Sequence, residues 1–263
     1  MIIDFHCHAG RGDVLTAPWN TIAPLQKYFT RARRAGIQRT VVIPAFHSDY
    51  AVANRALAKL IRQHSSLIGF AMVHPVKDAG RVREMLREAV RLNLRGIKVH
   101  GHEAMPTREV CEMARELKLP MLVDVAGKAH VIDMFAPEYP DVIFVIAHLG
   151  SFADDWRAHE RVVEQLARYP NVFADTSGVR RFDYLVSAAK KAGPGKLLFG
   201  SDGPWLHPAL ELQKIKLLGL PREAERAILG GNAQRILSSR SSLNRSLNPN
   251  RLEFLNRRVG AAR

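Results

Sequence analysis

Two histidines near the start of the chain, His6 and His8, stand at the end of an apolar segment, residues 2–8. Side chains alternate between the two faces of a β-strand, so imidazoles at positions i and i+2 point in the same direction. Neutral imidazole is the commonest metal ligand, and two of them make half of a four-coordinate site. The other half is available from His148 and Asp202, which each follow a later apolar segment.

The segments that must position these residues form a repeating pattern. Eight short apolar or β-branched segments, each ending in polar or glycine-rich residues, occur at 2–8, 39–46, 67–75, 95–100, 121–125, 142–150, 172–178 and 197–204. Apolar residues at i, i+3, i+4 and i+7 predict helices at 51–64, 82–92, 108–117 and 159–169. We therefore predict an α/β fold, a (β/α)8 TIM barrel with eight parallel strands. A doubly wound open sheet would need a glycine-rich phosphate turn that opens a helix after the first strand, and residues 9–13 open no obvious helix.

The histidines are concentrated at one end of this predicted barrel. Active sites of such barrels gather at the carboxyl ends of the strands. Six of the eleven histidines lie where a strand is expected to end: His6, His8, His47, His74, His100 and His148. This distribution predicts a polar mouth that binds a metal, a substrate or both.

The composition bounds the class of protein. The chain has 263 residues, of which 47% are hydrophobic, and a net charge of +14. We assign one barrel domain to residues 1–238 and a basic C-terminal tail to residues 239–263. Because no aromatic residues interleave the arginines, a solvated basic surface is favoured over nucleic-acid binding. An anionic small-molecule substrate is compatible with this charge.

Two further features concern location and redox chemistry. The chain has no apolar stretch long enough to span a bilayer and no charged-then-apolar leader, so we expect a cytoplasmic protein without a membrane partner. The two cysteines, Cys7 and Cys111, provide neither a disulfide framework nor a cysteine-rich zinc motif. Cys7 lies between His6 and His8 and should face the surrounding helices as a buried thiol.

Several motifs together resemble one family. The matching text is His6-Cys7-His8, Gly96-Ile97-Lys98-Val99-His100, Ala147-His148-Leu149-Gly150 and Phe199-Gly200-Ser201-Asp202-Gly203-Pro204, with further matches at 171–178 and 230–233. With these residues at the ends of strands one, four, six and eight, the chain resembles the amidohydrolase superfamily. It is similar in particular to the branch that includes metal-dependent hydrolases and aminocarboxymuconate semialdehyde decarboxylases. The resemblance covers residue 2 to about residue 238.

The resemblance implies a role for each residue. His6 and His8 would bind one divalent metal ion, usually zinc. Asp202 would be a further ligand that takes a proton from the metal-bound water, and His148 would polarise the scissile group or hold that water. Physical chemistry supports these roles, because zinc lowers the pKa of its water towards about 7 and a carboxylate can accept the proton. An imidazole opposite can stabilise a developing oxyanion.

One position departs from the family pattern. The family places a histidine ligand at the end of strand five, where this chain has Asp124. If Asp124 is a ligand, two carboxylates cancel the charge of the metal, and the oxygen-rich site shifts preference from zinc towards manganese or magnesium. Alternatively, Asp124 forms a buried ion pair with Lys98 on the neighbouring strand.

Substrate contacts are expected from residues around the mouth. Lys98 has three interpretations: a carbamylated bridge between two metals, a cation that holds a substrate carboxylate, or only the partner of Asp124. His100 lies one pleat further along the same face. Arg11 and Trp205 belong to the segments after strands one and eight, and an arginine there can clamp a carboxylate.

The leading hypothesis is a metal-dependent hydrolase that uses a metal-activated water on a small, anionic ester, lactone or amide. A lyase that decarboxylates or hydrates an unsaturated carboxylate would use the same residues. A TatD-like nuclease is a more distant alternative. It should carry a glutamate ligand on a middle strand, and this chain has Gly96-Ile97-Lys98 where such a residue could fall. From another class, a catalytically inactive barrel that serves as a binding module stays open, and so does a homodimer.

Overall fold

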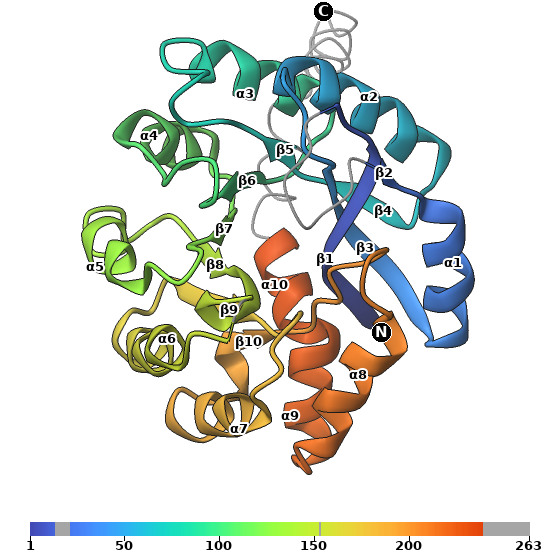
Figure 1. Ribbon diagram of the computed structural model, residues 1–263, viewed down its shortest axis with the longest axis vertical. Coiled ribbons are helices and arrows are strands. Elements are labelled where there is room, and N and C mark those ends of the chain that lie inside the picture. Colours follow the sequence, from blue (N-terminus) through green and yellow to red (C-terminus); the bar gives the residue numbers. More distant parts are fainter. Residues whose placement is uncertain (14–21, 153, 239–263) are drawn as a thin grey trace, which may run out of the picture.

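The computed structural model describes residues 1–13, 22–152 and 154–238. Strands form an inner ring and helices surround it, as the TIM-barrel prediction requires (Figure 1). The predicted basic tail, residues 239–263, lies outside the described residues. None of the helices in the described part of the chain has the length and apolar character needed to cross a bilayer.

The elements alternate along the chain. The first half contains β1 (Ile2–Arg11), β2 (Ile22–Ala23), α1 (Leu25–Arg34), β3 (Ile37–Pro44), α2 (Tyr50–Gln63), β4 (Leu67–Gly69), β5 (Ala71–Met72), α3 (Val82–Arg91), β6 (Ile97–His100) and α4 (Arg108–Leu117). The second half contains β7 (Met121–Asp124), α5 (Ile132–Phe135), β8 (Phe144–Ile146), α6 (Trp156–Arg168), β9 (Val172–Asp175), α7 (Phe182–Lys191), β10 (Leu197–Leu198), α8 (Pro208–Leu217), α9 (Arg222–Arg226) and α10 (Asn232–Ser238). Each of the eight predicted strand segments contains an observed strand.

Hydrogen bonds connect the strands into a closed barrel. The strands pair in parallel in the orders β1-β3-β4 and β5-β6-β7-β8-β9-β10, and β2 adds an antiparallel edge to β1. β4 and β5 flank Phe70, whose backbone N–H donates to the Val42 carbonyl at 2.9 Å. On the other side, the Phe5 N–H donates to the Phe199 carbonyl at 2.8 Å. The chain therefore returns to its first strand after β10.

The barrel interior is apolar at one end and polar at the other. Side chains from the strands form an inner cluster that also includes Ile236 and Leu237 of α10. Ile3 and Ile68, near the amino ends of their strands, belong to the same cluster. Helix α10 therefore packs over the amino ends of the strands (Figure 1), and the carboxyl ends are left to the polar residues.

A local irregularity in β1 decides which side chains enter the site. Pairing of β1 with β3 shifts register between Asp4 and Cys7, which indicates a β-bulge. As a result two consecutive side chains face the interior of the barrel. Phe5 belongs to the inner apolar cluster, and His6 belongs to the polar end. Asp4 instead accepts a hydrogen bond from Tyr28 of α1 at 2.7 Å. Cys7 is fully buried in the outer cluster between strands and helices, as predicted.

Two helices that leave the polar end begin at aspartate caps. The Asp49 carboxylate accepts from the backbone N–H groups of Ala51 and Val52 at the start of α2. Asp155 does the same for α6. Such caps satisfy backbone donors that would otherwise have no partner in the first turn. They fix where the loops around the mouth end.

Candidate metal centre

Three of the predicted residues converge at the carboxyl ends of the strands. His6, His148 and Asp202 each offer a ligand atom, and these atoms lie within 4.8 Å of one another. His6 Nε2 is 3.6 Å from Asp202 Oδ1, and His8 Nε2 is 3.4 Å from the same oxygen. All four side chains are at most 4% exposed. The sequence therefore predicted residues that do meet in space.

The backbone is strained at two of these positions. His148 and Leu149 have φ angles of 57° and 49°, and Asp202 has a φ of 53°. Residues other than glycine rarely adopt this left-handed region, and each instance costs about 1 to 3 kcal/mol. The Asp202 N–H donates to the His6 carbonyl at 2.7 Å, which ties the strained turn to β1. Such strain is typical of functional sites, where the fold forces a side chain into position.

Hydrogen bonds orient the imidazoles of His6 and His148. His6 Nδ1 lies 2.9 Å from Oδ2 of Asp175, and His148 Nδ1 lies 2.9 Å from the backbone carbonyl of Ser177. Both partners are acceptors, so each Nδ1 carries the proton. Each Nε2 is then left with a lone pair, and that of His6 accepts from Lys98 Nζ at 3.4 Å. This is the arrangement by which outer-shell carboxylates and carbonyls orient metal-binding histidines.

His8 lies at the wall of the mouth. Its Nδ1 is 3.3 Å from the Pro44 carbonyl, which again leaves the lone pair on Nε2. Its ring centroid is 4.2 Å from that of Trp205 and 6.1 Å from that of Phe46. Arg11 is exposed at the end of β1. Trp205 is thus brought against the candidate ligands, and Arg11 lies at the rim.

The charges around the site favour a bound cation. Burial, with the charge of Lys98 as the second cause, lowers the pKa of His6 to about 4, and burial lowers the pKa of His8 in the same way. Burial raises the pKa of the Asp202 carboxyl. With neutral imidazoles, the buried charges leave a net charge of −2, because three are carboxylates and one is an ammonium: Asp124, Asp175, Asp202 and Lys98.

The residues fit a divalent metal ion. Such an ion would bring the buried charge to zero and would fill three unprotonated Nε2 lone pairs that face a carboxylate. Metal–ligand bonds of 2.0–2.2 Å in a tetrahedral site place neighbouring ligand atoms about 3.4 Å apart. The separations of 3.4 Å and 3.6 Å between the imidazole nitrogens and Asp202 agree with that value.

The remaining predicted residues lie beside the same group of side chains. Lys98 is fully buried, and its Nζ lies 3.4 Å from His6 Nε2. Asp124 Oδ2 lies 3.3 Å from His100 Nε2, and Asp124 Oδ1 accepts from the Ala126 N–H at 2.7 Å. The side chain closest to the Asp124 carboxylate in the sheet is therefore that of His100, and the Ala126 N–H is its hydrogen-bond donor. Lys98 still influences it at longer range, since its charge helps to lower the pKa of the Asp124 carboxyl.

Sequence reasoning missed two residues that organise the site. Asp175 Oδ1 accepts from the Ser177 N–H at 2.9 Å and from the His148 N–H at 3.3 Å, while its Oδ2 holds His6. Ser177 Oγ lies 3.0 Å from His148 Nδ1 and 3.3 Å from His6 Nδ1. The signal was present in the sequence, since Asp-Thr-Ser-Gly follows the seventh predicted strand, but only its family likeness was noticed.

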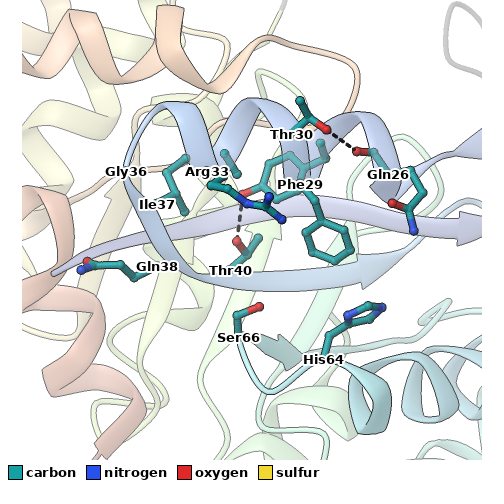
Figure 2. A pocket seen from close by; sticks show the side chains of 12 residues that line it. Gln26, Phe29, Thr30, Arg33, Gly36, Ile37, Gln38, Thr40, His64 and Ser66 are labelled. Atoms are coloured by element: carbon teal, nitrogen blue, oxygen red, sulfur yellow. Dashed lines mark hydrogen bonds between the residues drawn. The ribbon is translucent and has the colours of Figure 1, made fainter.

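A separate hollow lies on the outside of the barrel. It has a volume of about 620 Å³, and residues of α1, β3 and the segment after α2 line it, including Phe29, Arg33 and His64 (Figure 2). At its base, Tyr28 Oη and Thr40 Oγ1 are 2.8 Å apart. None of its lining residues is among the predicted site residues. The predicted site residues therefore lie apart from this hollow.

Replacing Asp175 by asparagine is expected to weaken metal binding about 10- to 100-fold, because His6 loses its carboxylate partner. Competition titration with a chromophoric chelator would measure this. The exposed carboxylate of Asp183, which pairs with Arg181, supplies the matched control Asp183→Asn. Equal affinities in the two variants would contradict the role of Asp175.

The lowered pKa of His6 predicts how acid acts on the metal-free protein. The folded pKa of about 4 lies below the ordinary value of 6.5. The stability that comes from the neutral imidazole is therefore fully present above pH 6.5 and is lost as the pH falls from 6.5 to 4. A shift of this size corresponds to about 3 kcal/mol. Urea unfolding at pH 7.0 and 4.5 should show this loss, and His6→Asn should reduce it. An equal loss in that variant would assign the effect elsewhere, and His130→Asn, at an exposed position, serves as the surface control.

Comparison with known proteins agrees with the fold. The sequence profile of the family described as Amidohydrolase matches residues 3–238. The chain therefore belongs to the amidohydrolase family, and it is an enzyme of the amidohydrolase type. No curated protein matches the chain.

Three solved structures illustrate the likeness, and this chain is covered to 90% in each. An amidohydrolase from Burkholderia multivorans with bound zinc has 18% identity, 99% coverage of its own chain and a TM-score of 0.74. A probable 2-pyrone-4,6-dicarboxylic acid hydrolase from Acinetobacter baumannii with bound citric acid has 16% identity, 99% coverage and a TM-score of 0.70. The 5-carboxyvanillate decarboxylase from Sphingomonas paucimobilis has 16% identity, 98% coverage and a TM-score of 0.69.

Proposed function

We propose that the protein is a metal-dependent hydrolase of a small, anionic ester, lactone or amide. The observation that carries this proposal is the group of unprotonated imidazole nitrogens around Asp202, in a buried site with two net negative charges. Membership of the amidohydrolase family supports it. Zinc is the expected metal, and manganese or magnesium are the alternatives.

The residues of the site would have distinct roles. A divalent ion, when bound, lowers the pKa of a water and polarises a carbonyl group. His6, His8 and Asp202 would hold that ion. Asp202 would also accept the proton that the water loses, because its second oxygen is available and burial raises the pKa of its carboxyl group.

The buried ammonium group of Lys98 supports a negatively charged substrate. Its ammonium group is buried beside the site, and the positive charge can hold a substrate carboxylate. Trp205 and Phe46, which flank His8, supply flat apolar walls for a small planar substrate. The similar hydrolase named for 2-pyrone-4,6-dicarboxylic acid acts, by its name, on a substrate of this kind. We therefore favour a carboxylated lactone as the first compound to test.

A lyase is the second candidate function. Three of the similar solved structures are decarboxylases, one named for 5-carboxyvanillate and two for 2,6-dihydroxybenzoate. The same metal centre and the same buried ammonium would serve decarboxylation of an aromatic or unsaturated acid. The residues at the site do not separate the two reactions, so product analysis must.

The test is a substrate panel with the zinc-loaded protein. It should contain carboxylated lactones, esters and amides, together with unsaturated dicarboxylates and hydroxybenzoates, and mass spectrometry should follow each product. Gain of one water without loss of carbon dioxide supports the hydrolase. Release of carbon dioxide would overturn it in favour of the lyase, and no turnover of any compound would favour an inactive binding barrel.

A further inference from the structure

From the geometry we infer that His148 is a metal ligand and that Asp124 is not. The fourth ligand would then come from the end of β8 and not from the end of β7, where the family pattern places it. This inference rests on the proposed function, since it assumes that a divalent metal binds at this site. It assigns three imidazoles and one carboxylate to the metal: His6, His8, His148 and Asp202.

The position of His148 supports this assignment. Its ring stacks on that of His6 with centroids 4.9 Å apart, and both residues belong to the group whose ligand atoms lie within 4.8 Å. The Ser177 carbonyl holds the proton on its Nδ1, so Nε2 is the free ligand atom. Gly178 leaves room for the Phe152 ring, which a Cβ there would meet at 2.6 Å and which packs edge-on against the His148 ring.

The backbone supports it as well. The left-handed φ of 57° at His148 is the conformation that brings its imidazole over His6. The His148 N–H also donates to Asp175 Oδ1, and the other oxygen of Asp175 holds His6 Nδ1. One carboxylate therefore positions both imidazoles. An arrangement that costs backbone strain and shares its anchor with His6 is suited to a shared ion.

Asp124 is committed to other partners. Oδ1 accepts from the Ala126 N–H at 2.7 Å, and Oδ2 lies 3.3 Å from His100 Nε2. His100 Nδ1 accepts from the His102 N–H at 3.4 Å, so the His100 proton is on Nε2, the atom nearest to Asp124. These contacts make Asp124 an anchored wall of the mouth, next to Lys98.

The choice of ligand changes the chemistry. With Asp124 as a ligand, two carboxylates would cancel the charge of a divalent ion. With His148 in its place, the ion keeps one positive charge and is the stronger Lewis acid. Three nitrogen donors also favour zinc over manganese or magnesium, which prefer oxygen. The inference therefore includes a preference of this chain for zinc.

X-ray absorption on the zinc-loaded full-length protein tests the ligand set directly. Multiple scattering from imidazole rings counts the histidines, and we expect three per zinc. Two imidazoles per zinc would overturn the inference and leave the proposed function intact. A protein that binds no zinc at all would instead overturn the proposed function.

Paired variants provide an independent readout. His148→Gln should weaken zinc affinity more than about 100-fold, because a ligand is lost, whereas loss of an outer-shell partner costs 10- to 100-fold. Asp124→Asn should change zinc affinity less than about threefold. His148→Cys supplies another zinc ligand and should recover most of the affinity. The reverse order, with Asp124→Asn the weaker binder, would overturn the inference, and circular dichroism verifies that each variant is folded.

Discussion

Replacing Asp202 by asparagine is expected to lower kcat/KM by at least about 1,000-fold for any substrate that the panel identifies. The variant loses the proton acceptor, and general base catalysis alone contributes about 100- to 10,000-fold. It also loses the carboxylate that lies 3.4 Å and 3.6 Å from the imidazoles of His8 and His6. Steady-state kinetics at saturating zinc would measure the effect on catalysis apart from the effect on metal affinity.

The matched control is Asp183→Asn, which removes a carboxylate from an exposed pair with Arg181. Its activity should stay within about twofold of the parent, since surface substitutions rarely matter. Retention of more than a tenth of the activity by the folded, zinc-loaded Asp202→Asn protein would contradict the role of Asp202 as the proton acceptor.

Removal of the metal by chelation is expected to lower Tm by on the order of 10 °C. A ligand present at 1,000 times its Kd stabilises the folded state by about 4 kcal/mol, and each kcal/mol shifts Tm by about 2–4 °C in a domain of this size. The physical cause is the net charge of −2, which is buried without a counter-ion once the metal leaves. Differential scanning calorimetry before and after chelation, and after zinc is added back, would measure it.

His6→Ala provides the control for chelation. This variant lacks a ligand, so its Tm should no longer respond to chelator or to zinc. An unchanged Tm of the parent protein after complete metal removal would contradict this prediction. It would mean that the buried carboxylates need no metal as counter-ion and that Lys98 is their main cation.

The fold was predictable from sequence because each strand is a short apolar segment and four of the helices, α2, α3, α4 and α6, have a clear period. The same pattern placed His6, His8, His148 and Asp202 at strand ends, and parallel strands bring such ends together. Simple alternation along β1 would have put Asp4 into the site as well. The bulge between Asp4 and Cys7 removes it, and a bulge depends on pairing with β3, which one strand's sequence does not reveal.

The partners of the site residues were not predictable in the same way. Asp175 and Ser177 hold His6 and His148 across three neighbouring parts of the barrel, so their role depends on register between strands. The proposed pairing of Asp124 with Lys98 followed from adjacency on the sheet. The structure brings His100 closer, because His100 is directly opposite Asp124 in the register of β6 and β7.

Elemental analysis of full-length protein purified without chelator tests the central claim most directly. The account predicts about one equivalent of a divalent metal per chain, zinc above all, with loss of that equivalent in His6→Ala. Less than a tenth of an equivalent of any divalent metal, with none taken up on titration, would contradict it.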